Sequence, residues 1–301
     1  MRLGTRGSPL AIIQTQELRD RLLAAHPGLE VEIVTVKTTG DRVQDRKLDE
    51  IGGKGLFTRE IEAQLDDGRL HVAVHSMKDV PTFLPGRYTL PFVLPRADVR
   101  DVLVSRESAT LASLPAGARV GTASLRRQAQ VLSRRPDLEV TLFRGNVNTR
   151  LRKLNEGVAD ATILARCGLD RLGMQDLGTT LSPEEMLPSV GQGAIGAEIR
   201  ADDEATRALL AAVNDADTET EMVCERALLA ALDGSCRTPI AGLAQLKDGT
   251  VWLRGLVVSP DGKKEWRTER RGPRSDAERM GRDAGEELRG RADPAIFEGP
   301  R

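Results

Sequence analysis

Short runs of β-branched and aliphatic residues alternate with helical patterns through the first two thirds of the chain. The runs are LEVEIVTV (29–36), LHVAVH (70–75), ARVGTA (118–123), LEVTLF (138–143) and DATILA (160–165). Regular alternation of strand and helix is typical of an α/β architecture, so we expect mostly parallel strands. With 301 residues, the chain is long enough for two or three domains.

Two segments of this α/β region resemble each other. Residues 4–8 (GTRGS) lead into a helical pattern over 9–25, and residues 121–124 (GTAS) lead into another over 125–134. The free N–H groups and the dipole at a helix N-terminus favour an anion. Ordinary capping by Ser or Thr explains either loop equally well. Because an arginine lies next to each loop, the two loops together favour anion binding over simple capping.

After about residue 214 the pattern changes to that of a small α+β domain. The expected elements are an amphipathic helix at 218–232, strands at 239–246, 250–258 and 264–270, and a charged helix at 274–289. In the first helix, Val223, Ala227, Leu228 and Ala231 are expected to share the buried face. The strands are expected to form a three-stranded antiparallel sheet.

Composition excludes several classes of protein. With 44 basic and 45 acidic residues the net charge is −1, which argues against a nucleic-acid coat or a membrane-surface protein. The chain has neither an export signal nor about 20 consecutive apolar residues, so we expect a cytoplasmic protein. The three cysteines, Cys167, Cys224 and Cys236, form no CxxC pair, so neither a disulfide framework nor a metal site is expected.

Arginines cluster at the ends of the strand-like runs. Arg6, Arg126 and Arg127 adjoin the two helix starts, and Arg144 and Arg150 lie in FRGNVNTRLRK. Loops at the carboxyl ends of strands line the ligand crevice of open α/β sheets. Arginine binds carboxylate and phosphate through a planar fork, so a polyanionic ligand is expected. The alternative is scattered, solvated arginine.

Asp79 and Lys78 follow the strand 70–75 in the run HSMKDVP. A carboxylate near several cations stays ionised and can stabilise a cationic intermediate or relay a proton. A simple turn explains the same residues equally well. The nearby His71 and His75 have no third ligand, which favours a packed or hydrogen-bonded pair over a metal site.

Two further loops carry candidate residues. IGGKGLF (51–57) lacks the spacing of a phosphate loop, so we interpret it as a glycine-rich lid carrying Lys54. Cys236 lies in DGSCRTP, a turn beside Arg237 in which a thiolate is a possible nucleophile. A lone loop cysteine is more often inert, and the residues alone do not decide between the two.

Taken together, seven ordered motifs resemble the hydroxymethylbilane synthase (porphobilinogen deaminase) family over essentially the whole chain. They are TRGSPLA (5–11), IGGKGLFTREIE (51–62), AVHSMKDVP (73–81), GTASLRRQAQ (121–130), FRGNVNTRLRKL (143–154), VGQGAIGAE (190–198) and ERALLAALDGSCRTPIA (225–241). The last is specific, because it is the family's cofactor-attachment signature. The sequence departs from common family patterns at Glu50, Asn148 and Ser235.

The resemblance implies a fold and a reaction. Two domains like type II periplasmic binding proteins (1–94 with 194–212, and 95–193) would precede a small α+β domain (213–301). The expected enzyme is a monomeric transferase that joins four porphobilinogen molecules head to tail and releases hydroxymethylbilane by hydrolysis. Its primer would be a dipyrromethane cofactor held by Cys236 through a thioether, and Asp79 would assist ammonia loss.

The resemblance also implies a set of residues that bind cofactor or substrate. They are Arg6, Ser8, Lys54, Lys78, Thr122, Ser124, Arg126, Arg127, Arg144, Arg150 and Arg171.

The main rival hypothesis is a non-catalytic, two-lobed binding protein for a small carboxylate or other dianion. It explains the paired helix starts and the arginines. It gives no reason for the cysteine turn in the third domain or for Asp79 among cations.

Overall fold

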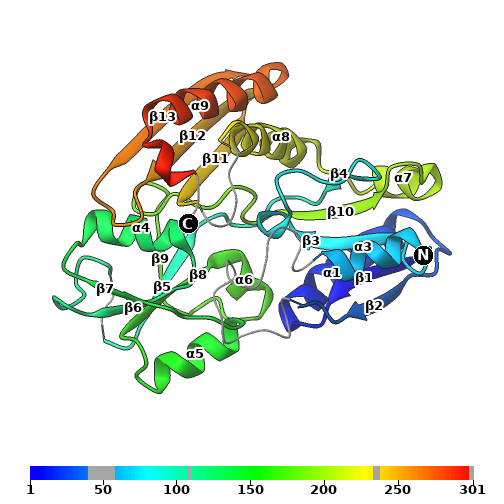
Figure 1. Ribbon diagram of the computed structural model, residues 1–301. Helices are drawn as coiled ribbons and strands as arrows, with labels where there is room; N and C mark the ends of the chain where they lie inside the picture. The colour runs from blue at the N-terminus through cyan, green and yellow to red at the C-terminus, as the bar shows by residue number, and fades with distance from the viewer. Residues whose placement is uncertain (40–57, 108–109, 233–237, 298–301) are drawn as a thin grey trace. The chain divides into compact units, whose positions relative to one another are not determined.

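The structure is a computed structural model that describes residues 1–39, 58–107, 110–232 and 238–297 (Figure 1). Contacts between residues divide the chain into two compact units. Unit 1 consists of Met1–Ala97 and Gly193–Glu219, and unit 2 of Asp98–Gln192 and Thr220–Arg301.

Unit 1 is built on a five-stranded sheet with the order β2-β1-β3-β10-β4. β1 is parallel to β2 and β3, whereas β10 is antiparallel to β3 and β4. The strands are β1 (Arg2–Arg6), β2 (Glu32–Val36), β3 (Val72–Ser76), β4 (Tyr88–Val93) and β10 (Ile195–Arg200). The helices are α1 (Pro9–Ala25), α3 (Arg59–Asp66), the short 3-10 helix η1 (Met77–Asp79) and α7 (Glu204–Ala211).

Helices cover both faces of this sheet. Leu18 of α1 packs with Val74 of β3 in one apolar cluster, and Ile61 of α3 packs with Ala73 in another. Because side chains alternate along a strand, Val74 and Ala73 face opposite sides of the sheet. The result is a three-layered unit with the ends of β1 and β3 leading directly into α1 and η1.

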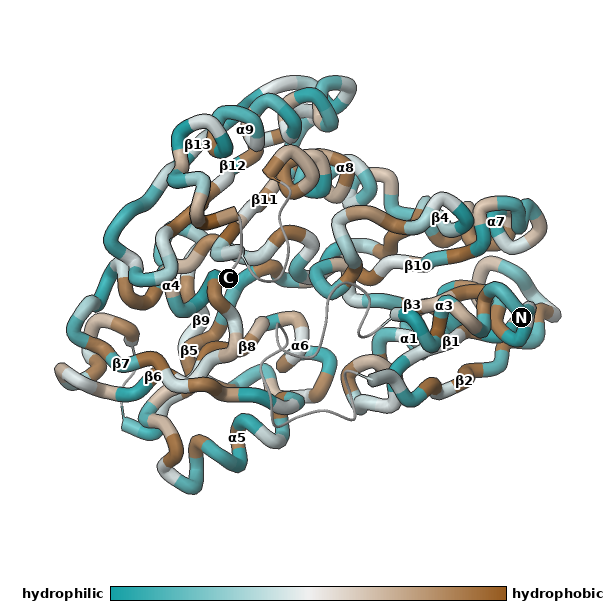
Figure 2. The backbone as a smooth tube through the Cα atoms, viewed as in Figure 1, coloured by the Kyte–Doolittle hydropathy of each residue, from teal (hydrophilic) through white to brown (hydrophobic). Residues whose placement is uncertain are grey.

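Unit 2 contains a second five-stranded sheet with the order β7-β6-β8-β5-β9. Its strands repeat the pairing directions of unit 1, since β6 is parallel to β7 and β8 while β5 is antiparallel to β8 and β9. The elements are β5 (Asp101–Ser105), β6 (Arg119–Gly121), α4 (Leu125–Arg134), β7 (Glu139–Thr141), α5 (Val147–Asn155), β8 (Ala161–Ala165), α6 (Arg166–Arg171) and β9 (Thr179–Leu181). In Figure 2 hydrophobic residues follow β5 and β8, whose side chains are mostly buried.

The C-terminal part forms a three-stranded antiparallel sheet, β11-β12-β13. Its elements are α8 (Ala216–Ala231), β11 (Ile240–Lys247), β12 (Thr250–Val258), β13 (Glu265–Pro273), η2 (Arg274–Asp276), α9 (Ala277–Arg291) and η3 (Pro294–Ile296). Cys224 and Leu228 of α8 join Leu253 and Ala284 in its core. Val223 is exposed, so the prediction that it lies on the buried face of α8 was wrong. Met222, Cys224 and Leu228 of this helix are buried instead.

The predicted fold class is confirmed, because two α/β sheets and a separate three-stranded antiparallel sheet are present. All five strand-like runs contain strands. The expectation of mostly parallel strands is confirmed, since four of the five strands in each large sheet run in one direction, while β10 and β5, in the fourth position, run against the others. The three-domain division stays a prediction. No helix within the described residues is both long and apolar enough to cross a membrane.

Candidate functional site

Two serines begin the helices that follow the repeated loops. Ser8 caps α1, where its Oγ accepts a hydrogen bond from the Ala11 N–H at 3.3 Å. Ser124 caps α4 by accepting from the Arg127 N–H at 3.4 Å. The Thr122 hydroxyl accepts from the Ser124 N–H at 3.1 Å, which shapes the second loop. Both serines therefore have the capping role, and ligand contact by these residues stays a prediction.

Arg126 and Arg127, in the first turn of α4, are buried, with only 5% and 6% of their surfaces exposed. Arg126 Nη2 and Arg127 Nη2 each donate to Asp101, at 2.7 Å and 2.7 Å. Their Nη1 atoms donate to backbone carbonyl groups of Leu187 and Ile163. The alternative of scattered, solvated arginine is wrong for this pair.

Asp101 is the residue that sequence reasoning missed. It opens β5, is fully buried, and also accepts from Gln192 Nε2 at 3.0 Å. Burial alone would raise the pKa of this carboxyl, but the charges and hydrogen bonds of Arg126 and Arg127 outweigh burial and hold the pKa well below its usual range. The signal available in the sequence was a charged residue at the start of an otherwise apolar strand.

The remaining predicted arginines lie near the ends of strands or helices. Arg6 ends β1 and is half-buried. Arg144 follows β7 and is half-buried, and its Nη1 is a buried donor without a partner among the described residues. Arg150 Nε donates to the Gly145 carbonyl at 2.9 Å, and Arg171 ends α6.

Asp79 and Lys78 lie in η1, directly after β3. Asp79 is exposed and Lys78 half-buried. Within the described part of the chain, the Asp79 carboxylate makes no hydrogen bond or ion pair. Because no cation and no backbone donor of the described residues engages it, this carboxylate is available to a ligand.

A buried polar pair lies on the strands behind Asp79. His75 Nε2 and Glu198 Oε2 are 2.7 Å apart, and both side chains are buried. His71 instead accepts at Nδ1 from the Arg2 N–H at 3.0 Å, so each histidine has its own partner. Burial, together with the charge of Glu198, raises the pKa of the nearby Glu62.

Lys54 and Cys236 lie outside the described residues. The predicted lid and the predicted cofactor anchor therefore stay predictions. Asn148 is one of the residues at which the sequence departs from the common family pattern. It lies in the first turn of α5, so the chain is helical there.

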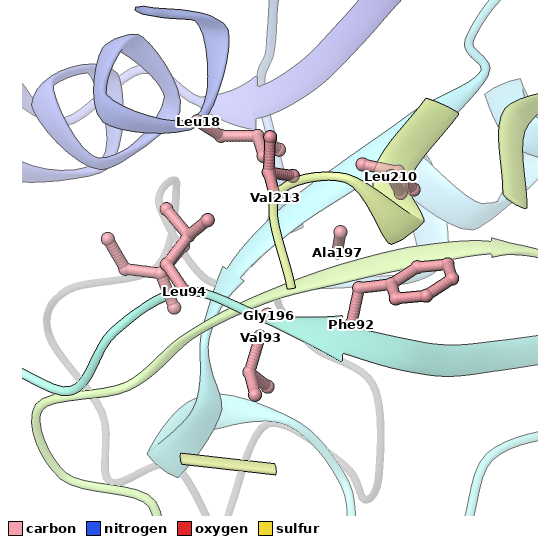
Figure 3. A pocket seen from close by; sticks show the side chains of 9 residues that line it. Leu18, Phe92, Val93, Leu94, Gly196, Ala197, Leu210 and Val213 are labelled. Atoms are coloured by element: carbon pink, nitrogen blue, oxygen red, sulfur yellow. The ribbon is translucent and has the colours of Figure 1, made fainter. Parts of the chain in front are cut away.

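Unit 1 contains an apolar pocket, shown in Figure 3. Leu18 of α1, Phe92 of β4, Leu210 of α7 and Val213 contribute side chains, and all nine residues that line it are nonpolar. Because none of these side chains offers a hydrogen-bond donor or a charge, the pocket does not suit a ligand that carries carboxylates.

Comparison with known proteins decides the family. The family model described as "Porphobilinogen deaminase, dipyromethane cofactor binding domain" matches residues 1–208, and "Porphobilinogen deaminase, C-terminal domain" matches residues 219–290. The chain belongs to the porphobilinogen deaminase family. The predicted resemblance is thereby confirmed.

Individual relatives of the family match nearly the whole chain. The porphobilinogen deaminase of Paracoccus denitrificans is 56% identical over 99% of this chain and 96% of its own length. The chloroplastic enzyme of Pisum sativum is 53% identical over 99% of this chain and 83% of its own. These matches support the enzyme and not the rival binding protein.

A solved structure of the aliphatic sulphonate binding protein SsuA from Escherichia coli is 13% identical, with a TM-score of 0.42, and covers 77% of this chain and 70% of that chain.

The residues of unit 2 fit the dipyrromethane cofactor that the family model names. Such a group carries acetate and propionate side chains, which need cationic hydrogen-bond donors. Arg126 Nε, Arg127 Nε and Arg144 Nη1 are buried donors that no described residue satisfies. Because a buried donor without an acceptor is costly, these three groups suit a ligand with several carboxylates.

Proposed function

We propose that this chain performs the reaction of the porphobilinogen deaminase family with Asp79 as its catalytic group and Cys236 as its cofactor anchor. In that reaction four porphobilinogen molecules are joined head to tail, each losing ammonia, and water releases hydroxymethylbilane. The observation that carries the proposal is the match of both family domains over residues 1–208 and 219–290.

Asp79 is suited to the step in which ammonia leaves. Loss of ammonia from porphobilinogen leaves a cationic pyrrole, and a nearby carboxylate stabilises that charge while it accepts hydrogen bonds from pyrrole N–H groups. Its exposure at the end of β3, free of internal ion pairs among the described residues, supports this role. Lys78, the next residue along η1, adds a cation for a substrate carboxylate.

Arginine side chains hold the carboxylates of the growing chain. Each pyrrole unit brings an acetate and a propionate, so the negative charge of the product increases with every addition. Bidentate guanidinium groups match this chemistry better than point charges do. The proposed contacts are Arg6, Ser8, Lys54, Lys78, Thr122, Ser124, Arg126, Arg127, Arg144, Arg150 and Arg171.

When bound, the dipyrromethane cofactor supplies the pyrrole carbon to which the first substrate is joined. Cys236 would hold it through a thioether, so that the primer stays attached during every addition. Support comes from the position of Cys236 in DGSC, which matches the family's attachment signature.

The proposal extends to the setting of the reaction. We expect a cytoplasmic monomer of three domains (1–94 with 194–212, 95–193 and 213–301) that binds neither nucleic acid nor membrane. The net charge of −1 supports the absence of a polyanionic partner.

The reaction is tested with purified protein and porphobilinogen, by measuring ammonia and hydroxymethylbilane together. Four ammonia molecules for each bilane are expected. Asp79→Asn should lower kcat by at least about 100-fold, while Asp202→Asn, which changes another exposed aspartate of unit 1, should leave it unchanged. Absence of bilane from the parent protein would contradict the proposed function, and a fully active Asp79→Asn variant would contradict the role of Asp79.

A further inference from the structure

Arg126 and Arg127 are held by a network that three separate segments of unit 2 build. Asp101 comes from the start of β5, the arginines from the first turn of α4, and Gln192 from the turn between two glycines. Each oxygen of Asp101 accepts from one guanidinium at 2.7 Å. Gln192 Nε2 donates to Asp101 Oδ1 at 3.0 Å and to the Val99 carbonyl at 2.7 Å.

The network fixes the orientation of both guanidinium planes. Adjacent residues of a helix point about 100° apart, so two neighbouring arginines reach one carboxylate only when both are bent toward it. The Leu187 and Ile163 carbonyl groups hold their other terminal nitrogens at 2.7 Å and 2.7 Å. With both ends of each guanidinium engaged, neither plane can rotate without breaking buried hydrogen bonds.

Charge explains why a carboxylate is needed there. Two buried cations at the N-terminus of α4 repel each other and lie at the positive end of the helix dipole. Asp101 offsets one of the two charges and leaves one net positive charge. The Nε of each arginine is buried and has no acceptor among the described residues. One positive charge and two oriented donors thus remain for an anionic ligand.

We propose that Asp101 and Gln192 are positioning residues that orient Arg126 and Arg127 toward substrate carboxylates. The inference rests on the proposed function, which assigns the two arginines to those carboxylates. Asp101 and Gln192 act through the arginines and touch no substrate themselves.

The test compares Asp101→Asn with Asp160→Asn in the complete enzyme. Asp160 is a matched control, because it too lies near two arginines of unit 2, with Arg119 Nη2 at 3.3 Å and Arg106 Nη2 at 3.7 Å, but neither is assigned to substrate. For Asp101→Asn we expect KM for porphobilinogen to rise about tenfold or more while kcat changes less. Folded Asp101→Asn protein is also expected to fail to acquire its cofactor, because the pyrrole units of the cofactor carry the same carboxylates as the substrate. Asp160→Asn should keep the KM of the parent.

Gln192→Met decides the question if Asp101→Asn does not fold. It removes one donor to Asp101 and leaves both arginines and the carboxylate in place, so we expect a folded enzyme with KM raised about threefold. An unchanged KM in folded, cofactor-loaded Asp101→Asn, or in Gln192→Met, would overturn the positioning role. That result leaves the proposed function intact, whereas a parent protein without activity would contradict the function itself.

Discussion

Substitution of Gly281 by alanine should push apart α8 and α9, the two helices that pack against each other in the C-terminal part of the chain. Gly281 lies in α9 where it crosses α8. A methyl group there would lie 2.1 Å from the Cys224 carbonyl oxygen and 2.9 Å from Ala227 Cβ. Because the closest atom belongs to the backbone of α8, it cannot rotate away. The helices would have to move apart by roughly 1 Å to restore an ordinary contact.

The free-energy change follows from two opposing effects. Overpacking of a core costs about 1–3 kcal/mol, and replacing glycine by alanine in a helix returns up to about 1 kcal/mol. Gly290→Ala provides the control, since a Cβ at Gly290 of the same helix meets nothing within 4 Å. We expect Gly281→Ala to lower the free energy of unfolding by about 2 kcal/mol and Gly290→Ala to leave it unchanged or raise it slightly.

Urea unfolding followed by circular dichroism, with the thermal midpoint as a second measurement, provides the assay. The effect bears on function, because the chain runs from α8 into residues 233–237, which include Cys236. Equal stabilities for the two alanine variants would refute the close packing of α8 against α9.

Three further predictions follow from single side chains. Asp79→Asn should lower kcat by at least about 100-fold with an unchanged thermal midpoint, because the carboxylate is exposed; a loss below threefold in a porphobilinogen assay would contradict it. Glu62→Gln should stabilise the protein at pH 7, because burial raises the pKa of Glu62 and its ionised form therefore opposes folding. That gain in stability should disappear as pH falls from the raised pKa of Glu62 in the folded protein to its pKa of about 4.5 in the unfolded chain. Urea unfolding at several pH values measures this trend, and a gain that does not change with pH would contradict the prediction. Hydrogen bonds from Arg270 and Thr268 lower the pKa of Glu287 to about 2, so Glu287→Gln should cost stability at neutral pH and progressively less as pH falls from 4.5 toward 2; a pH-independent cost would contradict this.

Local signals in the sequence predicted the starts of the helices that lead out of the repeated loops. Ser8 followed by Pro9, and Ser124 before an amphipathic run, place the first residues of α1 and α4 where the structure has them. A capping serine acts within one turn of helix, so its effect is readable from adjacent residues. Strands such as β3 and β8 were predicted for the same reason, since β-branched runs are local.

Features that depend on distant partners were not predictable in this way. The antiparallel direction of β10 and β5 is set by pairing with β3 and β8, which lie far away along the chain. Asp101 meets its arginines 25 and 26 residues further along the chain and Gln192 91 residues further. Val223 is apolar and fits the helical period, so the sequence predicts that it is buried. In the structure α9 packs with Cys224 and Leu228 of α8, and Val223 stays exposed.

The proposed function depends most on a covalent cofactor at Cys236, and the mass of the intact, denatured protein tests for that cofactor directly. Parent protein and Cys236→Ser should be purified side by side. We expect an adduct of two pyrrole units on the parent and none on the variant. A parent protein that carries no adduct, and remains unmodified and inactive after incubation with porphobilinogen, would contradict it.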